Sequence, residues 1–137
     1  MSSTQTKFIL VGEDDKDDQE LLAEIFTSID DSYRLMFVDT GNEAMSLLHK
    51  LNDDQRPCLI LLDFNMPQVS GADILKEINR LEIYGDIPKI IWSTSGSDYY
   101  KKICLDLGAT DYLIKPSNLK ELQNAVRYML SFCENPA

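Results

Sequence analysis

The stretch Cys58-Leu-Ile-Leu-Leu-Asp63-Phe-Asn65-Met-Pro67-Gln-Val-Ser-Gly71 decides the fold of this chain. It is an apolar run that ends in an aspartate, and an Asn, a Pro and a Gly follow within a few positions. A short apolar run bounded by such residues is typical of a strand buried on both faces, as in parallel sheets. Asp63 would then stand at the carboxyl end of a strand, where open α/β sheets place their ligands. The alternative is an aspartate that merely starts a turn.

Four further apolar runs alternate with amphipathic helical patterns along the chain. Strands are predicted at 7–12, 33–38, 58–63, 89–92 and 111–116, and helical patterns at 21–29, 41–51, 74–81, 99–107 and 117–132. Asp15 or Asp17 is expected to cap the first helix. Five alternations with short connectors predict an α/β fold, a doubly wound five-stranded parallel sheet with five helices on its two faces.

The bulk composition describes a single globular domain. The chain has 137 residues, contains no apolar run near the roughly 20 residues of a membrane span, and begins without a secretory signal. Cys58, Cys104 and Cys133 lie far apart inside apolar patterns, so we expect three reduced, buried thiols and a cytoplasmic protein, with neither a disulfide nor a zinc site. The only histidine, His49, is expected at the surface and not at a metal.

The net charge of the chain indicates which kinds of binding partner to expect. The net charge is -10, with 23 acidic and 13 basic residues. A nucleic-acid surface needs clustered Lys and Arg, so none is expected, and no membrane partner is expected either. Simple solubility explains most of the charge, and the rest suggests protein partners or a cation.

The predicted strand ends carry complementary chemistry. In a parallel sheet these ends share one edge, so three carboxylates, one or two hydroxyls and one ammonium should converge there. Oxygen ligands without His or Cys suit Mg²⁺, and the ammonium and hydroxyl suit a phosphoryl group. Because an aspartate carboxylate can itself accept a phosphoryl group, phosphoryl transfer to an aspartate is the predicted chemistry. The residues are Glu13, Asp14, Asp63, Ser93, Thr94 and Lys115.

These motifs resemble those of a known family. The chain is similar to the receiver domain of two-component response regulators, especially single-domain, chemotaxis-type and phytochrome-associated ones. The resemblance covers residues 7–132, leaves 1–6 and 133–137 as short tails, and implies a flavodoxin-like sheet of strand order 2-1-3-4-5. The motifs that carry it are Val11-Gly-Glu13-Asp14-Asp15, Leu62-Asp63-Phe-Asn65-Met66-Pro67 with Gly71, Ser93-Thr94 and Gly108-Ala-Thr-Asp-Tyr112-Leu-Ile-Lys115-Pro116.

The resemblance implies a phosphorylation site and a magnesium site. Asp63 matches the phosphoacceptor and also a metal ligand. Asp14 matches the magnesium-binding acid, and Glu13 matches the acid beside it, which often acts through water. Asn65 matches the position whose backbone carbonyl binds the metal.

The resemblance also implies a catalytic pair and a switch. Ser93 matches the hydroxyl that contacts the phosphoryl group, Lys115 the lysine that pairs with it, and Tyr112 the aromatic ring that turns inward when the hydroxyl moves. Ser at 93 and Glu at 13 are ordinary variants of the family pattern. Gly12 is a less usual residue there, and the sequence offers no reason for it.

The expected function is that of a single-domain response regulator and not of a metabolic enzyme. It would assist its own phosphorylation and slow dephosphorylation, with a sensor histidine kinase or phosphotransfer protein as partner, and would signal by protein contact or phosphorelay. The segment 99–102 with the last helix is the candidate partner surface, and residues 129–133 could extend a homodimer interface or pack on the sheet. A receiver-like interaction module that is never phosphorylated is the alternative. A dehalogenase-like phosphatase would want an aspartate where Asn65 stands.

Overall fold

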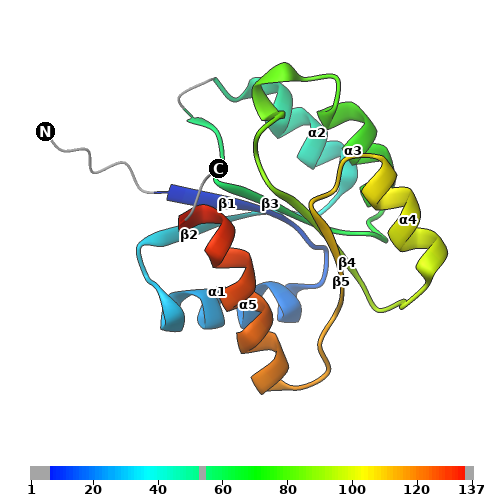
Figure 1. Cartoon of the computed structure of the whole chain (residues 1–137). Coiled ribbons are helices and arrows are strands. Elements are labelled where there is room, and N and C mark those ends of the chain that lie inside the picture. The colour runs from blue at the N-terminus through cyan, green and yellow to red at the C-terminus, as the bar shows by residue number, and fades with distance from the viewer. Residues whose placement is uncertain (1–6, 53–54, 135–137) are drawn as a thin grey trace, which may run out of the picture.

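The computed structural model describes residues 7–52 and 55–134, so the predicted tail 1–6 and residues 135–137 lie outside the described part. Its five strands form one parallel sheet in the order β2-β1-β3-β4-β5, which confirms the predicted fold and strand order. The helices α1 and α5 cover one face and α2, α3 and α4 the other (Figure 1). In chain order the elements are β1 (Lys7–Gly12), α1 (Lys16–Ile29), β2 (Tyr33–Val38), α2 (Gly41–Lys50), β3 (Leu59–Asp63), α3 (Gly71–Ile78), the 3₁₀ helix η2 (Glu82–Tyr84), β4 (Lys89–Ser93), α4 (Asp98–Asp106), β5 (Asp111–Ile114) and α5 (Leu119–Glu134).

The central strand β3 explains why the deciding stretch is continuously apolar. All five of its residues are buried. Ile60 and Leu62 pack into the core under α2, α3 and α4, whereas Leu59 and Leu61 pack into the core under α1 and α5. A strand covered on both faces has no solvent side, so no polar residue alternates along it until Asp63 at its end.

The third helix ends earlier than the sequence-based expectation. The helix α3 stops at Ile78, and Leu81 instead precedes η2, whose Tyr84 is fully buried and donates its phenol hydrogen to the Leu48 carbonyl at 2.6 Å. Burial of this ring together with its hydrogen bond to α2 stabilises the turn that follows Ile78. At the first helix, Asp15 is the N-cap, as predicted, and accepts from the backbone N–H groups of Asp17 and Asp18.

The structure supplies the reason for Gly12. A Cβ atom at this position would lie 2.6 Å from the Met66 sulfur and 3.0 Å from a Leu62 methyl group. Met66 lies in the loop after β3 and is buried against the end of β1. A side chain at position 12 would occupy the space that Met66 fills, so this position favours glycine. Gly71 plays a similar part at the start of α3, since a Cβ there would lie 3.0 Å from the Asp63 carbonyl oxygen.

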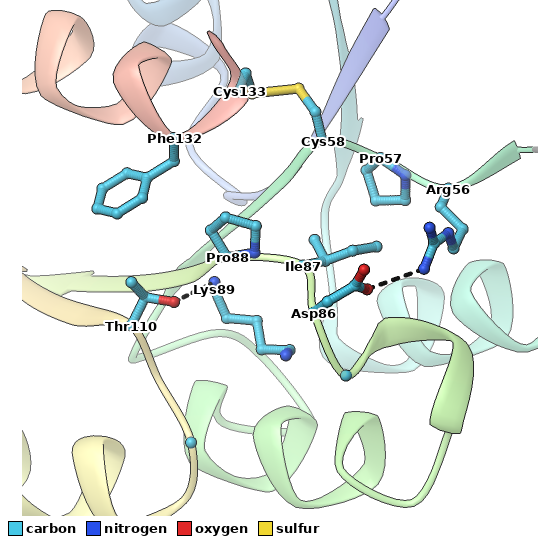
Figure 2. A pocket seen from close by; sticks show the side chains of 12 residues that line it. Arg56, Pro57, Cys58, Asp86, Ile87, Pro88, Lys89, Thr110, Phe132 and Cys133 are labelled. Carbon is cyan, nitrogen blue, oxygen red and sulfur yellow. Dashed lines mark hydrogen bonds and ion pairs between the residues drawn. A yellow bond between two sulfur atoms is a disulfide. The ribbon is translucent and has the colours of Figure 1, made fainter. Parts of the chain in front are cut away.

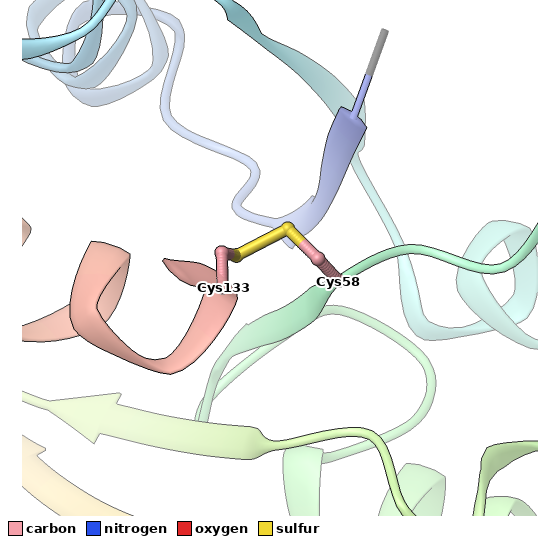
Figure 3. Close-up of a disulfide and its surroundings, with 2 residues drawn as sticks. All are labelled: Cys58 and Cys133. Carbon is pink, nitrogen blue, oxygen red and sulfur yellow. A yellow bond between two sulfur atoms is a disulfide. The ribbon is translucent and has the colours of Figure 1, made fainter. Parts of the chain in front are cut away.

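The expectation of three reduced thiols is wrong for two of the cysteines. Cys58, just before β3, and Cys133, in the last turn of α5, form a disulfide with their Cα atoms 5.2 Å apart (Figure 3). The pair is separated by 75 residues, so no local spacing could reveal it. Cys104 is free and buried, as predicted.

The end of α5 packs on the sheet and does not form an exposed tail. Met129, Leu130 and Cys133 are buried in the core under α1 and α5, and the helix continues two residues beyond the predicted end at Phe132. The suggestion that residues 129–133 extend a dimer interface is therefore wrong for these three side chains. Among the described residues, no helix is both long and apolar enough to cross a membrane.

The thiol arrangement predicts a reactivity pattern. Burial raises the pKa of the Cys104 thiol to about 11, so the native oxidised protein should show no thiol reactive to Ellman's reagent at pH 8. In denaturant without reductant one thiol should react, and with prior reduction three. A Cys104→Ala variant should show none in denaturant until it is reduced. Three reactive thiols in unreduced, denatured wild type would contradict the disulfide.

Candidate functional site

The carboxyl ends of the strands bring one ammonium between two carboxylates. Glu13 follows β1, Asp63 ends β3 and Lys115 follows β5. The Lys115 Nζ atom donates to Glu13 Oε1 at 2.9 Å and to Asp63 Oδ2 at 2.8 Å. The backbone N–H of Lys115 donates to the Ser93 carbonyl at 2.8 Å, which prolongs the pairing of β4 and β5 and fixes the start of the lysine side chain.

Burial makes these charges interact strongly. The Glu13 side chain is 1% exposed and that of Asp63 9%, whereas Lys115 keeps 17%. Burial raises the pKa of Glu13, although the Lys115 ammonium opposes that shift. For Lys115 burial alone would lower the pKa, but hydrogen bonds to Asp63 and Glu13 outweigh it and the pKa is raised. One ammonium between two carboxylates leaves a net negative charge at the strand ends, which a cation can neutralise.

The three acids predicted as metal ligands lie together. One carboxylate oxygen from each of Glu13, Asp14 and Asp63 lies within 4.8 Å of the other two. Mg²⁺ takes oxygen ligands at about 2.0–2.1 Å, so these oxygens would have to draw closer together to share one ion. Glu13 and Asp63 are buried while Asp14 is exposed, which leaves the site open to water on one side. The donor set, all carboxylate oxygen, fits magnesium.

The loop after β3 orients the Asp63 carboxylate. The backbone N–H of Asn65 donates to Asp63 Oδ1 at 2.9 Å, so one oxygen is held by Asn65 and the other by Lys115. The structure thus places Asn65 beside Asp63 through its amide hydrogen. That its carbonyl binds a metal stays a prediction.

The predicted switch residues are joined through Ser95. The Ser93 side chain is fully buried, and its Oγ accepts from the Ser95 backbone N–H at 3.0 Å. The Ser95 carbonyl accepts from the Tyr112 hydroxyl at 2.8 Å. The Tyr112 ring is buried and therefore lies inward, edge-on to Phe64 with centroids 6.4 Å apart. Ser93 forms no hydrogen bond with Asp63 within the described part of the chain.

Two contributions to the site were missed by the sequence reasoning. The Gln19 amide is buried and donates to the Glu13 carbonyl at 2.5 Å and to Asp39 Oδ1 at 2.8 Å. Gln19 lies three and seven residues before Leu22 and Phe26, on the buried stripe of α1, so its helical position was the signal. The second is Phe64, whose ring stacks on Tyr100 of α4 with centroids 4.7 Å apart.

Three other candidates lie away from the carboxylates or serve different roles. His49 is exposed and pairs with Glu77 at 3.0 Å, in agreement with a surface role. Thr94 is exposed, unlike its neighbour Ser93. In the candidate partner segment Tyr99 is 69% exposed, whereas Tyr100 is half-buried against Phe64.

Comparison with known proteins identifies the family. The model of the response regulator receiver domain matches residues 9–127. The chain belongs to this family. Its members are signalling proteins, and phosphorylation by a histidine kinase is their known role.

Two relatives share nearly the whole receiver domain. The response regulator Rcp1 of Synechocystis sp. is 32% identical over 133 residues, which span 95% of this chain and 90% of Rcp1. The crystal structure of the phosphorylated cyanobacterial phytochrome response regulator RcpA superposes with a TM-score of 0.85 at 31% identity and covers 97% of both chains.

Metal-bound structures of similar receiver domains agree with the magnesium prediction. A Mn²⁺-bound form of Rcp1 matches with a TM-score of 0.80 at 32% identity, over 92% of this chain and 93% of that one. The receiver domain of the sensor histidine kinase PA1611 from Pseudomonas aeruginosa, with magnesium in its active-site cleft, matches with a TM-score of 0.73 at 27% identity, over 93% and 99%. Other relatives are longer: this receiver domain spans 42% of the transcriptional regulator CpxR homolog of Haemophilus influenzae.

Removing the bridging ammonium should destabilise this receiver domain. In a Lys115→Met variant Glu13 and Asp63 would face each other without a counter-charge, so the free energy of unfolding in EDTA should fall by roughly 3 kcal/mol. Urea unfolding measures it, and added Mg²⁺ should restore more stability to the variant than it adds to wild type. Lys101→Met, which removes an exposed lysine, is the matched control. Equal stability of the two variants would contradict the bridging role.

Proposed function

We propose that this protein accepts a phosphoryl group on Asp63 from a histidine kinase or phosphotransfer protein and then signals by protein contact or phosphorelay. The observation that carries the proposal is the Lys115 ammonium, which bonds to Asp63 Oδ2 at 2.8 Å at the end of the central strand. A buried carboxylate that is oriented by a cation and a backbone N–H, with two further acids beside it, supports the uptake of a phosphoryl group.

The proposed transfer follows from the positions of the chain's own groups. A carboxylate oxygen of Asp63 forms the new P–O bond as the P–N bond of a phosphohistidine breaks, and the imidazole leaves with that electron pair and then takes a proton. Lys115, already beside Asp63, pairs with the incoming oxygens, and Ser93 has a hydroxyl hydrogen to donate because its Oγ accepts from Ser95. Glu13, Asp14, Asp63 and the Asn65 carbonyl would hold Mg²⁺, which neutralises charge on the phosphoryl oxygens.

The proposed output runs through Ser93 and Tyr112. Drawing the Ser93 hydroxyl toward a phosphoryl group disturbs the Ser95 segment to which Tyr112 is bonded. That segment leads into α4, where Tyr99 is exposed, and lies near exposed Ile114 of β5. Exposed apolar groups there support a protein partner, which includes a second copy of the chain, better than a nucleic acid.

The proposed location is the cytoplasm. A disulfide in that compartment is one that cellular reductants can open, so Cys58 and Cys133 would be bonded only for part of the time. The proposed role is that of a phosphoacceptor and not of a metabolic enzyme.

Trp92 offers a direct test. Its ring is buried and lies 5.5 Å from Lys115 Nζ, so movement of that ammonium toward a phosphoryl group should change the indole emission. Beryllofluoride with Mg²⁺, a mimic of aspartyl phosphate, should produce a saturable change in wild type and none in Asp63→Asn. Acetyl phosphate should add one phosphoryl group to wild type by mass spectrometry. Absence of both effects would favour an interaction module that is never phosphorylated.

A further inference from the structure

A cavity lies at the end of the sheet where the strands begin, opposite to the end that carries Asp63. It has a volume of about 450 Å³ and is enclosed by the segment before β3, the turn between η2 and β4, the start of β5 and the end of α5 (Figure 2). This volume falls in the range of small-molecule sites. Since Cys58 lines the cavity at one end of β3 and Asp63 ends the strand at the other, the full length of the sheet separates it from the phosphorylation site.

One wall of this cavity carries a buried cation without a partner. Lys89, the first residue of β4, is 5% exposed, and within the described residues its ammonium makes no hydrogen bond or ion pair. Its backbone is fixed, because the Lys89 N–H donates to Thr110 Oγ1 at 3.0 Å. The Lys89 side chain lines the cavity (Figure 2), as do Gly85 and Gly108.

The nearby acid does not satisfy Lys89. The Asp86 carboxylate is turned to Arg56, whose Nη1 donates to Asp86 Oδ1 at 3.0 Å. Burial lowers the pKa of Lys89, and the more distant Asp86 charge only partly opposes that shift. Because this mostly buried ammonium has no anionic partner among the described residues, an anion in the cavity would form a favourable charge pair with it.

The rest of the lining is mixed: Arg56, Asp86 and Thr110 contribute polar groups, and the other side chains are apolar. Pro57, Pro88 and Phe132 line the cavity together with the disulfide of Cys58 and Cys133 (Figure 2). Proline rings and the phenyl ring offer flat surfaces that suit an aromatic or other planar body. A free inorganic anion would leave these surfaces in water, so the walls favour a ligand that combines an acid with an apolar part.

We propose that this cavity binds a small molecule with one acidic group on a flat apolar body, the acid paired with Lys89 and the body packed on Phe132 and Pro88. The site is independent of phosphorylation. The net charge of -10 repels anions from the protein as a whole, so binding depends on this local cation and on the apolar walls.

Two dyes of the same shape separate the two contributions. Anilinonaphthalene sulfonate carries one anion on an aromatic frame, and N-phenylnaphthylamine is the neutral counterpart. Fluorescence titration of the wild-type protein should show one saturable site that prefers the sulfonate by roughly tenfold or more, since a hydrogen bond to a charged group supplies about that factor. Lys89→Met should remove this preference, and Lys89→Arg, which keeps the charge, should retain most of it. The exposed-lysine control Lys101→Met should bind as wild type does.

Further measurements locate the site and check the variants. Phe132→Ala should weaken both dyes by a similar factor, because it removes apolar wall and no charge. Lys89→Met should remain folded by circular dichroism, with unchanged thermal stability or a higher one, since it replaces an unpaired buried charge with an apolar group. The proposal is overturned by wild type that binds no sulfonate, by equal binding of the two dyes to wild type, or by a sulfonate preference that survives in Lys89→Met.

Discussion

The arrangement of the site depends on one interaction, the contact of the Lys115 ammonium with Glu13 and Asp63. Two carboxylates buried at the ends of neighbouring strands would repel each other, and the parallel order β1-β3-β4-β5 puts a lysine from the sheet edge within reach of both. Two local features near this contact, at Gly12 and Asn65, shape the loop that carries Asp63. The absence of a side chain at Gly12 lets Met66 fold against β1, and the Asn65 amide holds the second Asp63 oxygen.

Lys89, which is buried, and Lys115, which is half-buried, show how an anionic partner changes the pKa of a lysine. Burial alone lowers the pKa of both Lys115 and Lys89. For Lys115 two hydrogen-bonded carboxylates reverse the shift, whereas the Asp86 charge near Lys89 is too distant to do so and is engaged with Arg56. Lys115 is paired at one end of the sheet, whereas Lys89 at the other end has no anionic partner among the described residues, so Lys89 has more to gain from an added anion.

The fold and the strand-end residues were predictable because both follow from local patterns. Apolar runs that end in Asp63 or Lys115 identify strands, and parallel topology places their ends at one edge. The disulfide was not predictable, because Cys58 and Cys133 meet only through the packing of α5 on β3. The buried end of α5 could not be predicted for a similar reason. An amphipathic pattern in the sequence does not reveal whether the apolar side of a helix packs on the sheet of its own chain or on a partner protein. Gln19 could have been found from its place on the stripe of α1.

The bonds of Ser95 give the proposed movement of Ser93 a route to Tyr112. Ser95 donates its N–H to Ser93 and accepts at its carbonyl from Tyr112, so one peptide segment is held from both sides. In the proposed switch, Ser93 cannot move toward a phosphoryl group without stretching the first bond or moving the segment. If the segment moves, the Tyr112 hydroxyl must follow it or lose its acceptor. Because a buried phenol without a partner is costly, following the segment is the favoured response. In the proposed switch, Tyr112 is therefore coupled to the Ser93 hydroxyl by hydrogen bonds through Ser95 and not by ring packing alone.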